Sequence, residues 1–398
     1  MIEKDMIVAG VMSGTSADGI NVALVQVGDS STPEGLKPAF TLIGCAEYSY
    51  PKKVRSAVLG TMNAAAVSVA DLARLNFLLG ELYSRAVLAA QRKFRAKVDL
   101  VGCHGQTLYH QGEAQPFLGR RIAATWQTGE GAIIASRVGV PVVSDLRPAD
   151  MAAGGKGAPL VPYLDYILFR DPHIGRIAQN IGGIANLTAI PAGATLETVF
   201  AFDTGPGNMV IDAVTEKLFD RPFDRGGKIA ASAKVADKVI REILGRSFFR
   251  KKPPKTAGRE EFGREFVHEF MQLCKGCREQ DIVATATALT AKSIADAVRR
   301  HVITKQRAQQ PGFREGFREM ILSGGGARNV TLVSMLTSEL APLGLVLRFS
   351  DEFGLPSAAK EAVAFAVLAH ETWHRRASNV PSATGAKRPA VLGKISYP

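Results

Sequence analysis

Short turns rich in Gly, Ser, Thr, Asp and Asn follow apolar, strand-like segments near residues 13, 104, 182, 203 and 324. In α/β proteins, ligands bind at strand ends, and glycine lets backbone N–H groups approach a phosphate because it carries no Cβ. The first turn, Ser13–Asp18, supplies hydroxyls, amides and one carboxylate. These groups suit a cradle for β- and γ-phosphates with Asp18 near Mg²⁺. An ordinary polar hairpin turn has the same composition, so this turn alone leaves both interpretations open.

Asp203 follows an apolar strand-like segment and precedes Thr-Gly-Pro-Gly-Asn. A carboxylate at a strand end, beside flexible backbone, suits a general base in a cleft. The same position also suits an N-cap of the helix expected over 209–219. The local sequence therefore leaves a catalytic and a capping role open.

Two further glycine clusters, Asn180–Asn186 and Ser323–Asn329, resemble turns that cradle a nucleotide. A single cluster of this kind is also typical of a tight turn. Two clusters on separate strands, together with the turn after Ser13, favour a nucleotide site because such turns present several free amides to phosphate.

His104 and the segment Asp145–Asp150 add polar groups that suit a polyhydroxylated ligand. His104 could act as an acid, a base or a hydrogen-bond donor to a sugar, although a lone histidine is also common as a structural residue. In the segment, carboxylates accept hydrogen bonds from sugar hydroxyls, while Arg147 donates in a fork. An Asp–Arg ion pair that only holds the glycine-rich loop behind it would give the same pattern.

Hydrophobic periodicity predicts the elements that must position these groups. Strands are expected at 6–11, 20–27, 99–103, 140–144, 176–179, 199–202, 320–322 and around 391, and helices at 67–95, 129–138, 209–219, 281–302 and 358–374. Residues 305–318 are expected to form a surface linker. Both halves carry strand-and-turn units, which suggests a duplicated α/β fold with a cleft between two domains.

The composition is that of a globular protein with a large core. The chain has 398 residues, of which 46% are hydrophobic and 22% charged, and its mean hydropathy of +0.06 excludes wholesale disorder. The net charge of +12 is spread along the chain; no nucleic-acid module is recognisable, so we expect no nucleic-acid partner. Apolar runs are too short for a membrane span or a secretory signal. We therefore expect a cytoplasmic protein with no membrane partner.

Several other functional classes lack their signatures. Cys274 and Cys277 have the spacing of a redox or zinc pair, but no second pair accompanies them, and two reduced thiols on a helix is the simpler expectation. The sequence assigns them no role. The pattern Gly-x-x-x-x-Gly-Lys-Ser/Thr is absent, which disfavours a P-loop NTPase, and no set of protein-kinase motifs occurs.

Taken together, the motifs resemble the anhydro-N-acetylmuramic acid kinase family over residues 7 to about 395. The matching segments are Gly10–Gly19, His104–Thr107, Asn180–Asn186, Asp203–Asn208, Pro253–Glu260, Gly324–Asn329 and Lys360–Ala362. Fungal levoglucosan kinase, in the same superfamily, shares most of them. The resemblance implies an α/β, two-domain actin-like ATPase (ribonuclease H-like) fold with a central inter-domain cleft. We place domain I at residues 1–140 plus 375–398 and domain II at 141–374.

The resemblance also implies a reaction, with ATP and Mg²⁺ as cofactors. Water attacks the anomeric carbon of a 1,6-anhydrosugar while O6 takes the γ-phosphoryl group, giving N-acetylmuramic acid 6-phosphate for peptidoglycan recycling. The family's general base matches Asp203, and Asp18 would lie near Mg²⁺. Substrate contacts are expected at His104, Arg147 and Glu361. ATP contacts are expected at Gly14, Thr15, Ser16, Ala17, Asp18, Gly19, Ile20, Asn21, Gly182, Gly183, Gly205, Gly325 and Asn329. A homodimer is implied as well.

One position departs from the family pattern. Asn21 stands where the family usually has aspartate, so metal affinity would fall if that charge orders Mg²⁺; we expect Asp18 to suffice. Two alternatives stay open. One is a kinase of another 1,6-anhydrosugar such as levoglucosan. The other is a non-catalytic nucleotide-dependent sensor on an actin-like fold, which would be expected to have lost Asp18, Asp203 or Glu361, yet all are present.

Overall fold

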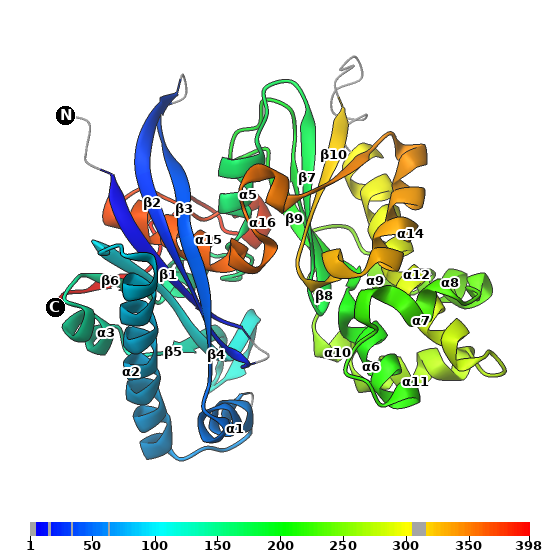
Figure 1. Ribbon diagram of the computed structural model, residues 1–398, viewed down its shortest axis with the longest axis horizontal. Helices are drawn as coiled ribbons and strands as arrows, with labels where there is room; N and C mark the ends of the chain where they lie inside the picture. The colour runs from blue at the N-terminus through cyan, green and yellow to red at the C-terminus, as the bar shows by residue number, and fades with distance from the viewer. Residues whose placement is uncertain (1–4, 15–16, 33–34, 63, 305–315) are drawn as a thin grey trace. The chain divides into compact units, whose positions relative to one another are not determined.

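The computed structural model describes residues 5–398 except 15–16, 33–34, 63 and 305–315, so most of the linker expected at 305–318 lies outside the described residues. The chain divides into two compact units, Met1–Ile167 with Ala359–Pro398, and Leu168–Ala358 (Figure 1). These bounds differ from the division at 140/141 and 374/375. The difference arises because strand β6 (Val142–Ser144) pairs within the first sheet, and helix α15 (Lys360–Trp373) packs on that sheet.

The first unit is built on a mixed sheet with the strand order β12-β6-β4-β1-β2-β3, and β5 pairs with β4. β1 runs antiparallel to β2 and parallel to β4. The first predicted strands are therefore confirmed, although β4 extends far beyond the expected 99–103. The strands span Met6–Ser13 (β1), Gly19–Thr32 (β2), Gly35–Ser49 (β3), Leu100–Phe117 (β4), Arg120–Thr128 (β5) and Lys394–Ser396 (β12).

The second unit repeats the plan of the first. Its sheet has the order β11-β10-β7-β8-β9, with strands Gly175–Ile181 (β7), Ile184–Ile190 (β8), Phe200–Pro206 (β9), Phe317–Ser323 (β10) and Val346–Phe349 (β11). In both sheets an antiparallel meander of three strands is followed by two strands parallel to the first of them. This repeat confirms the expected α/β class and matches the actin-like, ribonuclease H-like arrangement. The inter-domain cleft stays a prediction.

Helices cover both faces of the first sheet. The long helix α2 (Val69–Phe94) begins after Ser68, whose hydroxyl accepts from the amide of Asp71, and it ends where Arg95 turns left-handed. Its buried residues pack with Ala9 and Val11 of β1, so that face of the strand is core. The other helices of this unit are α1 (Lys52–Thr61), α3 (Gly131–Val138), α4 (Leu146–Ala152), α5 (Pro162–Phe169, which crosses the unit boundary) and α16 (Pro381–Thr384).

α15 approaches the other face of the first sheet closely because two strand residues lack a side chain. A Cβ on Gly10 would lie 1.8 Å from the carbonyl oxygen of Ala362, and one on Gly102 would lie 2.2 Å from that of Phe365. Any larger residue would push the helix off β1 and β4. This close packing holds the N-terminal turn of α15, with Glu361, at a defined place on the sheet.

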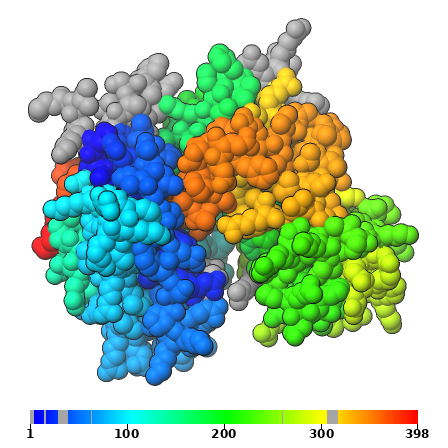
Figure 2. Space-filling view, viewed as in Figure 1, coloured from blue at the N-terminus to red at the C-terminus, as the bar shows by residue number. Residues whose placement is uncertain are grey.

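The second unit has its core on one face of its sheet. α12 (Glu279–Ala297), α14 (Val330–Leu340) and α6 (Asn208–Phe219) pack there with residues such as Leu187 and Met320. The expected helix 281–302 is confirmed, but its end, Val298–Ile303, is a π-helical turn. Further helices are α7 (Lys228–Ala231), α8 (Asp237–Leu244), α9 (Ser247–Arg250), α10 (Arg259–Phe262) and α11 (Arg264–Leu273). Figure 2 shows the green part of the chain, to which several of these helices belong, at the surface.

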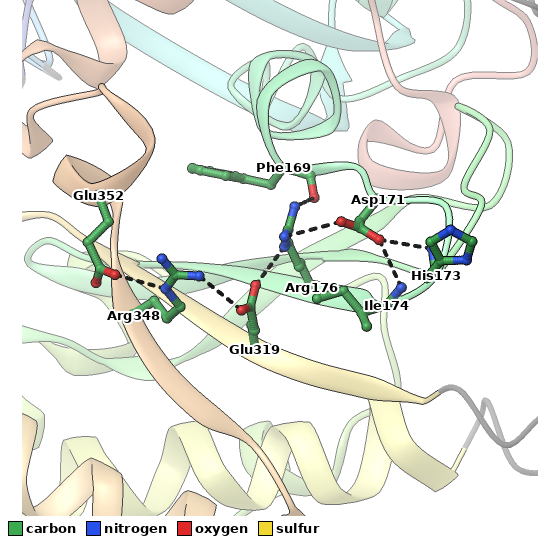
Figure 3. A network of polar contacts seen from close by, with 8 residues as sticks. All are labelled: Phe169, Asp171, His173, Ile174, Arg176, Glu319, Arg348 and Glu352. Atoms are coloured by element: carbon green, nitrogen blue, oxygen red, sulfur yellow. Dashed lines mark hydrogen bonds and ion pairs between the residues drawn. The ribbon is translucent and has the colours of Figure 1, made fainter.

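A row of charged side chains crosses the opposite side of the second sheet (Figure 3). Glu319 on β10 accepts from Nε of Arg176 on β7 at 2.7 Å and from Nη1 of Arg348 on β11 at 3.1 Å. Asp171 lies 3.3 Å from Nη2 of Arg176. The side chains of Arg176 and Glu319 are only 14% and 15% exposed. Glu319 therefore links three parallel strands through a charge network that is largely shielded from water.

Candidate active site

The hairpin turn between β1 and β2 is the expected phosphate cradle. Thr15 and Ser16 lie outside the described residues. Ala17 is buried with a φ of +52°, and its amide donates to the carbonyl of Gly14 at 3.1 Å. Ile20 packs its side chain in the core, so only its backbone could face a ligand. Asp18 points to solvent with its side chain 61% exposed, and Arg55 lies 3.1 Å from its carboxylate.

A buried polar network braces this turn from below. Ser13 donates from Oγ to Oε1 of Gln106 at 2.7 Å, and Gln106 donates from Nε2 to the carbonyl of Gly14 at 3.2 Å. Tyr50 donates its hydroxyl to Ser13 at 2.9 Å and lies 3.0 Å from the hydroxyl of Tyr83. The sequence named Ser13 in the phosphate turn, but it pointed to neither Tyr50 nor Tyr83 and gave Gln106 no role, although Gln106 belongs to a matched motif. The hydroxyl of Ser13 is engaged inside the protein, so it is not available to a phosphate.

His104 and Arg147 form a hydrogen-bonded pair in the first unit. His104 donates from Nδ1 to the carbonyl of Gly105 at 2.8 Å, and its Nε2 accepts from Nε and Nη2 of Arg147 at 3.1 and 2.8 Å. Burial, and then the charge of Arg147, hold the pKa of His104 well below its usual range. The ring is neutral and both of its nitrogens are occupied. This arrangement orients Arg147 and leaves no ring N–H of His104 for a ligand.

Arg147 retains donors after its contacts within the protein. Its Nη1 donates to the carbonyl of Gly157 at 2.8 Å, and other N–H groups of the guanidinium stay available. Burial lowers its pKa to about 10, against the opposing charges of Glu361 and Asp150, so it is still a cation at neutral pH. Glu361, in the first turn of α15, is open to solvent. Although the side chain of Glu361 reaches solvent, the protein packed around its carboxylate desolvates it, and this raises its pKa against the opposing charges of Arg147 and Lys360.

The two aspartates near Arg147 have structural partners. Asp150 is fully buried and accepts from the amide of Gly157 at 2.8 Å, from Nδ2 of Asn379 at 2.8 Å and from Oγ1 of Thr384 at 2.7 Å. Asp145 lies 3.0 Å from Nζ of Lys394. Asp150 therefore holds the glycine-rich loop without an ion pair to Arg147, and its oxygens are taken.

In the second unit, Asp203 lies inside β9. The sequence had placed it just after the end of this strand. Its Oδ2 accepts from the amide of Ala257 at 2.7 Å, and its own amide donates to the carbonyl of Lys255 at 3.0 Å. α6 begins at Asn208 with Gly207 at the N-cap, so the capping role considered for Asp203 is wrong. Within the described residues, Oδ1 accepts no hydrogen bond. One oxygen is anchored and the other is free.

The surroundings of Asp203 make its carboxylate more basic than usual. Burial raises its pKa to about 6, against the opposing effects of the Ala257 amide and the Lys255 charge. Lys255 is itself buried; its Nζ donates to the carbonyl of Phe248 at 3.2 Å and lies 4.5 Å from the ring centroid of that residue. Burial lowers the pKa of Lys255 to about 8. The sequence named the segment around Lys255 but assigned this residue no role.

The predicted ATP contacts of the second unit separate into two groups. The carbonyls of Gly182 and Gly183 accept hydrogen bonds at 2.7 to 3.1 Å from the backbone amides at the start of α6. Those amides of α6 are therefore engaged within the protein. Gly205 is tightly packed, since a Cβ there would lie 2.7 Å from Oγ of Ser293. Gly325 and Asn329, in contrast, line a pocket.

This pocket has a volume of about 280 Å³ and lies wholly within the second unit. Asn329 accepts from the amide of Leu332 at 3.0 Å, which caps α14. The sequence could have suggested Asp212, because it lies one helical turn after Asn208; nothing in the sequence pointed to Phe223. The pocket lining is Asn208, Ile211, Asp212, Phe223, Asp224, Gly226, Gly325, Arg328 and Asn329.

Metal and thiol chemistry find limited support. Across the part of the chain that the structure describes, no group of three or more His, Cys, Asp or Glu side chains could hold a metal ion.

Cys274 and Cys277 were expected on a helix, but they follow the end of α11. Burial raises the pKa of Cys274 to about 12, which keeps it a thiol. Asn21 lies on β2 opposite Glu47, and its effect on metal binding stays a prediction.

Two α/β units, whose sheets share the order of five strands, define an actin-like ATPase class of fold. The second unit adds a half-buried carboxylate and a pocket lined by glycines. A sequence model of the anhydro-N-acetylmuramic acid kinase family matches residues 6–398, and the chain belongs to this family. No helix among the described residues is long and apolar enough to cross a membrane.

Relatives with this activity in their names match along their full length. An anhydro-N-acetylmuramic acid kinase of Bacillus cereus is 42% identical over 396 residues, covering 99% of this chain and 100% of the relative. The anhydro-N-acetylmuramic acid kinase of Caldanaerobacter subterraneus subsp. tengcongensis is 41% identical over 401 residues, which cover 99% of this chain and 98% of the relative. Among solved structures, component A of (R)-2-hydroxyglutaryl-CoA dehydratase from Acidaminococcus fermentans is 11% identical with a TM-score of 0.43. The match covers 92% of this chain and 98% of that structure.

Proposed function

We propose that the protein is an ATP- and Mg²⁺-dependent kinase that opens the 1,6-anhydro ring of anhydro-N-acetylmuramic acid and phosphorylates O6. Family membership supports the reaction class. The observation that carries the proposal is the state of Asp203: Oδ2 is anchored by the Ala257 amide, Oδ1 is free among the described residues, and the pKa is about 6. This is the state expected of a general base working near neutral pH.

Asp203 would take a proton from water that attacks the anomeric carbon. The new bond joins the water oxygen to C1, and the bond between C1 and O6 breaks. O6 then forms its bond to the γ-phosphorus while the bond from that phosphorus to the departing ADP breaks. Opening the bridge itself releases O6, so no side chain is needed to deprotonate it. A carboxylate with a pKa of about 6 is ionised at pH 7 and is more basic than an ordinary aspartate.

Arg147 supports an anionic sugar as the substrate. Its unused N–H groups could donate in a fork to the lactyl carboxylate that distinguishes the muramic sugar from levoglucosan. Glu361 would accept hydrogen bonds from sugar hydroxyls or from the N-acetyl amide. His104, expected to contact the sugar directly, is proposed instead to hold Arg147 in place, because both of its nitrogens are already bonded.

ATP would place its phosphates against the backbone of the turn at 14–19 and against the glycines of the second unit. Asp18 fits Mg²⁺ by its chemistry, since its carboxylate is exposed and held only loosely by the exposed Arg55. Mg²⁺ commonly binds through one or two carboxylates and the substrate phosphates while it keeps several waters. When bound, the ion would neutralise charge on the transferring phosphoryl group.

We also propose, on the strength of family membership, a homodimer acting in the cytoplasm in peptidoglycan recycling. Light scattering coupled to size-exclusion chromatography tests the dimer directly, since a mass near twice 42.5 kDa is expected. A mass that stays at one chain across the accessible concentration range would contradict it.

The test of function is turnover of a defined sugar. Purified protein is mixed with Mg·ATP and 1,6-anhydro-N-acetylmuramic acid, with levoglucosan in parallel, and both ADP and phosphorylated sugar are followed. Asp203→Asn should lower kcat by at least about 10³-fold. Asp220→Asn, the same change at an exposed carboxylate at the end of α6, should leave kcat unchanged.

Each outcome has a distinct meaning. Turnover of the muramic sugar that is lost only in Asp203→Asn supports the substrate and the base together. Turnover of levoglucosan alone would replace the substrate while keeping the mechanism. ATP binding without turnover of either sugar would overturn the kinase proposal in favour of a nucleotide-dependent sensor.

A further inference from the structure

The pocket of the second unit holds a carboxylate without a partner in the described part of the protein. Asp224 accepts from the amides of Ile229 and Ala230 at 2.9 and 3.0 Å, and Asn329 caps α14. Asn208 donates its side-chain amide to the carbonyl of Ile181 at 3.3 Å. Among the described residues, the carboxylate of Asp212 makes no hydrogen bond and no ion pair. It is the carboxylate in this pocket that is left for a ligand.

Asp212 is partly desolvated without a compensating charge. Burial, with a further contribution from Glu216 on the same helix, raises its pKa to about 6. Arg328 lines the same pocket but forms no ion pair with Asp212. A half-buried carboxylate without a partner costs free energy, and a ligand that donates hydrogen bonds would recover it.

The position of Asp212 along α6 indicates which part of a nucleotide it would meet. Asn208, at the start of the helix, has its side chain within 3.5 Å of the place where a Cβ on Gly325 would stand. The glycine end of the pocket is therefore beside Asn208. Asp212 lies four residues further on, about 6 Å along the helix axis. If the glycine end takes phosphate, the next group of the ligand past it is the ribose.

The rest of the pocket suits a base. Phe223 lines it with its side chain 47% exposed, and Ile211 adds an apolar surface. Exposed aromatic rings stack on nucleobases of every kind. The volume of about 280 Å³ is near the lower end of small-molecule pockets, which fits the nucleoside portion of a nucleotide whose phosphates extend from the glycine end.

We propose that this pocket binds the nucleoside of the phosphoryl donor, and that Asp212 is the residue that selects a ribonucleotide by accepting hydrogen bonds from the ribose 2′- and 3′-hydroxyls. The inference rests on the proposed use of ATP and adds the sugar specificity of the donor. The 2′-hydroxyl is the group that a deoxyribonucleotide lacks. Phe223 contributes affinity for the base and does not distinguish the two sugars.

The test measures binding of ADP and of 2′-deoxyADP by calorimetry, with no anhydrosugar present. Wild-type protein should bind ADP about tenfold more tightly than 2′-deoxyADP, as expected for one hydrogen bond to a charged acceptor. Asp212→Ala should bring the two Kd values within about twofold of each other, mainly by weakening ADP. Asp212→Asn, nearly isosteric, provides a second variant in case alanine disturbs the helix.

Two further variants serve as controls. Glu216→Gln removes an exposed carboxylate one turn further along α6 and should keep the tenfold discrimination. Phe223→Ala should weaken both nucleotides by the same factor. Equal wild-type affinities for the two nucleotides, or discrimination that survives in both Asp212 variants, would overturn the inference; no measurable ADP binding would overturn it together with the use of ATP.

These readouts separate the inference from the proposed function. If no phosphorylated sugar forms but ADP binding shows the discrimination and its loss at Asp212, the kinase proposal fails and this inference stands. If sugar is phosphorylated but 2′-deoxyADP binds as tightly as ADP, the inference fails and the kinase proposal stands.

Discussion

Replacing Asp203 by Asn should make the protein more stable at neutral pH while it removes activity. Asn keeps a side-chain oxygen that can accept from the Ala257 amide, which Asp203 does at 2.7 Å. It removes only the negative charge and the ability to take up a proton. A catalytic residue whose charge is buried is expected to lower the stability of the folded protein. A residue with a purely structural role is not expected to do so.

The size of the effect follows from the pKa of Asp203. Burial raises it from 3.8 to about 6, a difference worth about 3 kcal/mol. The folded state therefore binds the proton more tightly than the unfolded state does. Its favourable contribution is fully present below about pH 4 and is lost as the pH rises through about 6. Above that, wild type carries a constant cost of about 3 kcal/mol that Asn lacks.

The assay is the free energy of unfolding from denaturant titrations of wild type and Asp203→Asn between about pH 4 and pH 8. We expect the variant to match wild type at the acid end and to be about 2–3 kcal/mol more stable at pH 8. Asp220→Asn should show no such trend, because that carboxylate is exposed. A variant that is less stable than wild type at pH 8, or a difference that does not change with pH, would show that the buried charge of Asp203 does not destabilise the fold.

Three further predictions concern other parts of the protein. Lys255→Met removes a cation that lowers the pKa of Asp203, so the acidic limb of the pH profile of kcat/KM should move up by about one pH unit; an unmoved limb would show that Lys255 does not tune the base. Glu319→Gln should lower the free energy of unfolding by about 2–3 kcal/mol in denaturant titration, because Arg176 loses a largely shielded partner; a loss under about 0.5 kcal/mol would place the row among ordinary surface pairs. His104→Ala should raise KM for the sugar about tenfold without changing KM for ATP, with partial rescue by His104→Gln, whose side-chain oxygen can still accept from Arg147; equal changes in both KM values would point to general misfolding.

Local sequence patterns predicted much of the fold. The helix expected at 67–95 is α2 at Val69–Phe94, and the hairpin around residues 13–19 is formed by β1 and β2. These elements follow from hydrophobic periodicity and small-residue turns, which are local properties of the chain. The helix expected at 281–302 ends in a π-helical turn at Val298–Ile303, a hydrogen-bonding change that periodicity does not reveal.

The candidate site was less predictable, because its properties depend on contacts between distant residues. The type and position of Asp203 suggested a base, but its raised pKa comes from burial, and the anchoring of its Oδ2 depends on the amide of Ala257, 54 residues away. His104 was expected to contact a sugar, and only its bond to Arg147, 43 residues on, indicates a positioning role. Asp212 was missed because a single carboxylate in an amphipathic helix looks like a surface residue.

The most direct test of the central claim follows the oxygen atoms of a short turnover in ¹⁸O-labelled water, with product analysed before the free anomeric oxygen exchanges. We expect label on the anomeric carbon of the phosphorylated sugar, an unlabelled phosphoryl group, and no product from Asp203→Asn. Label in the phosphoryl group, or labelled product formed at the wild-type rate by Asp203→Asn, would contradict it.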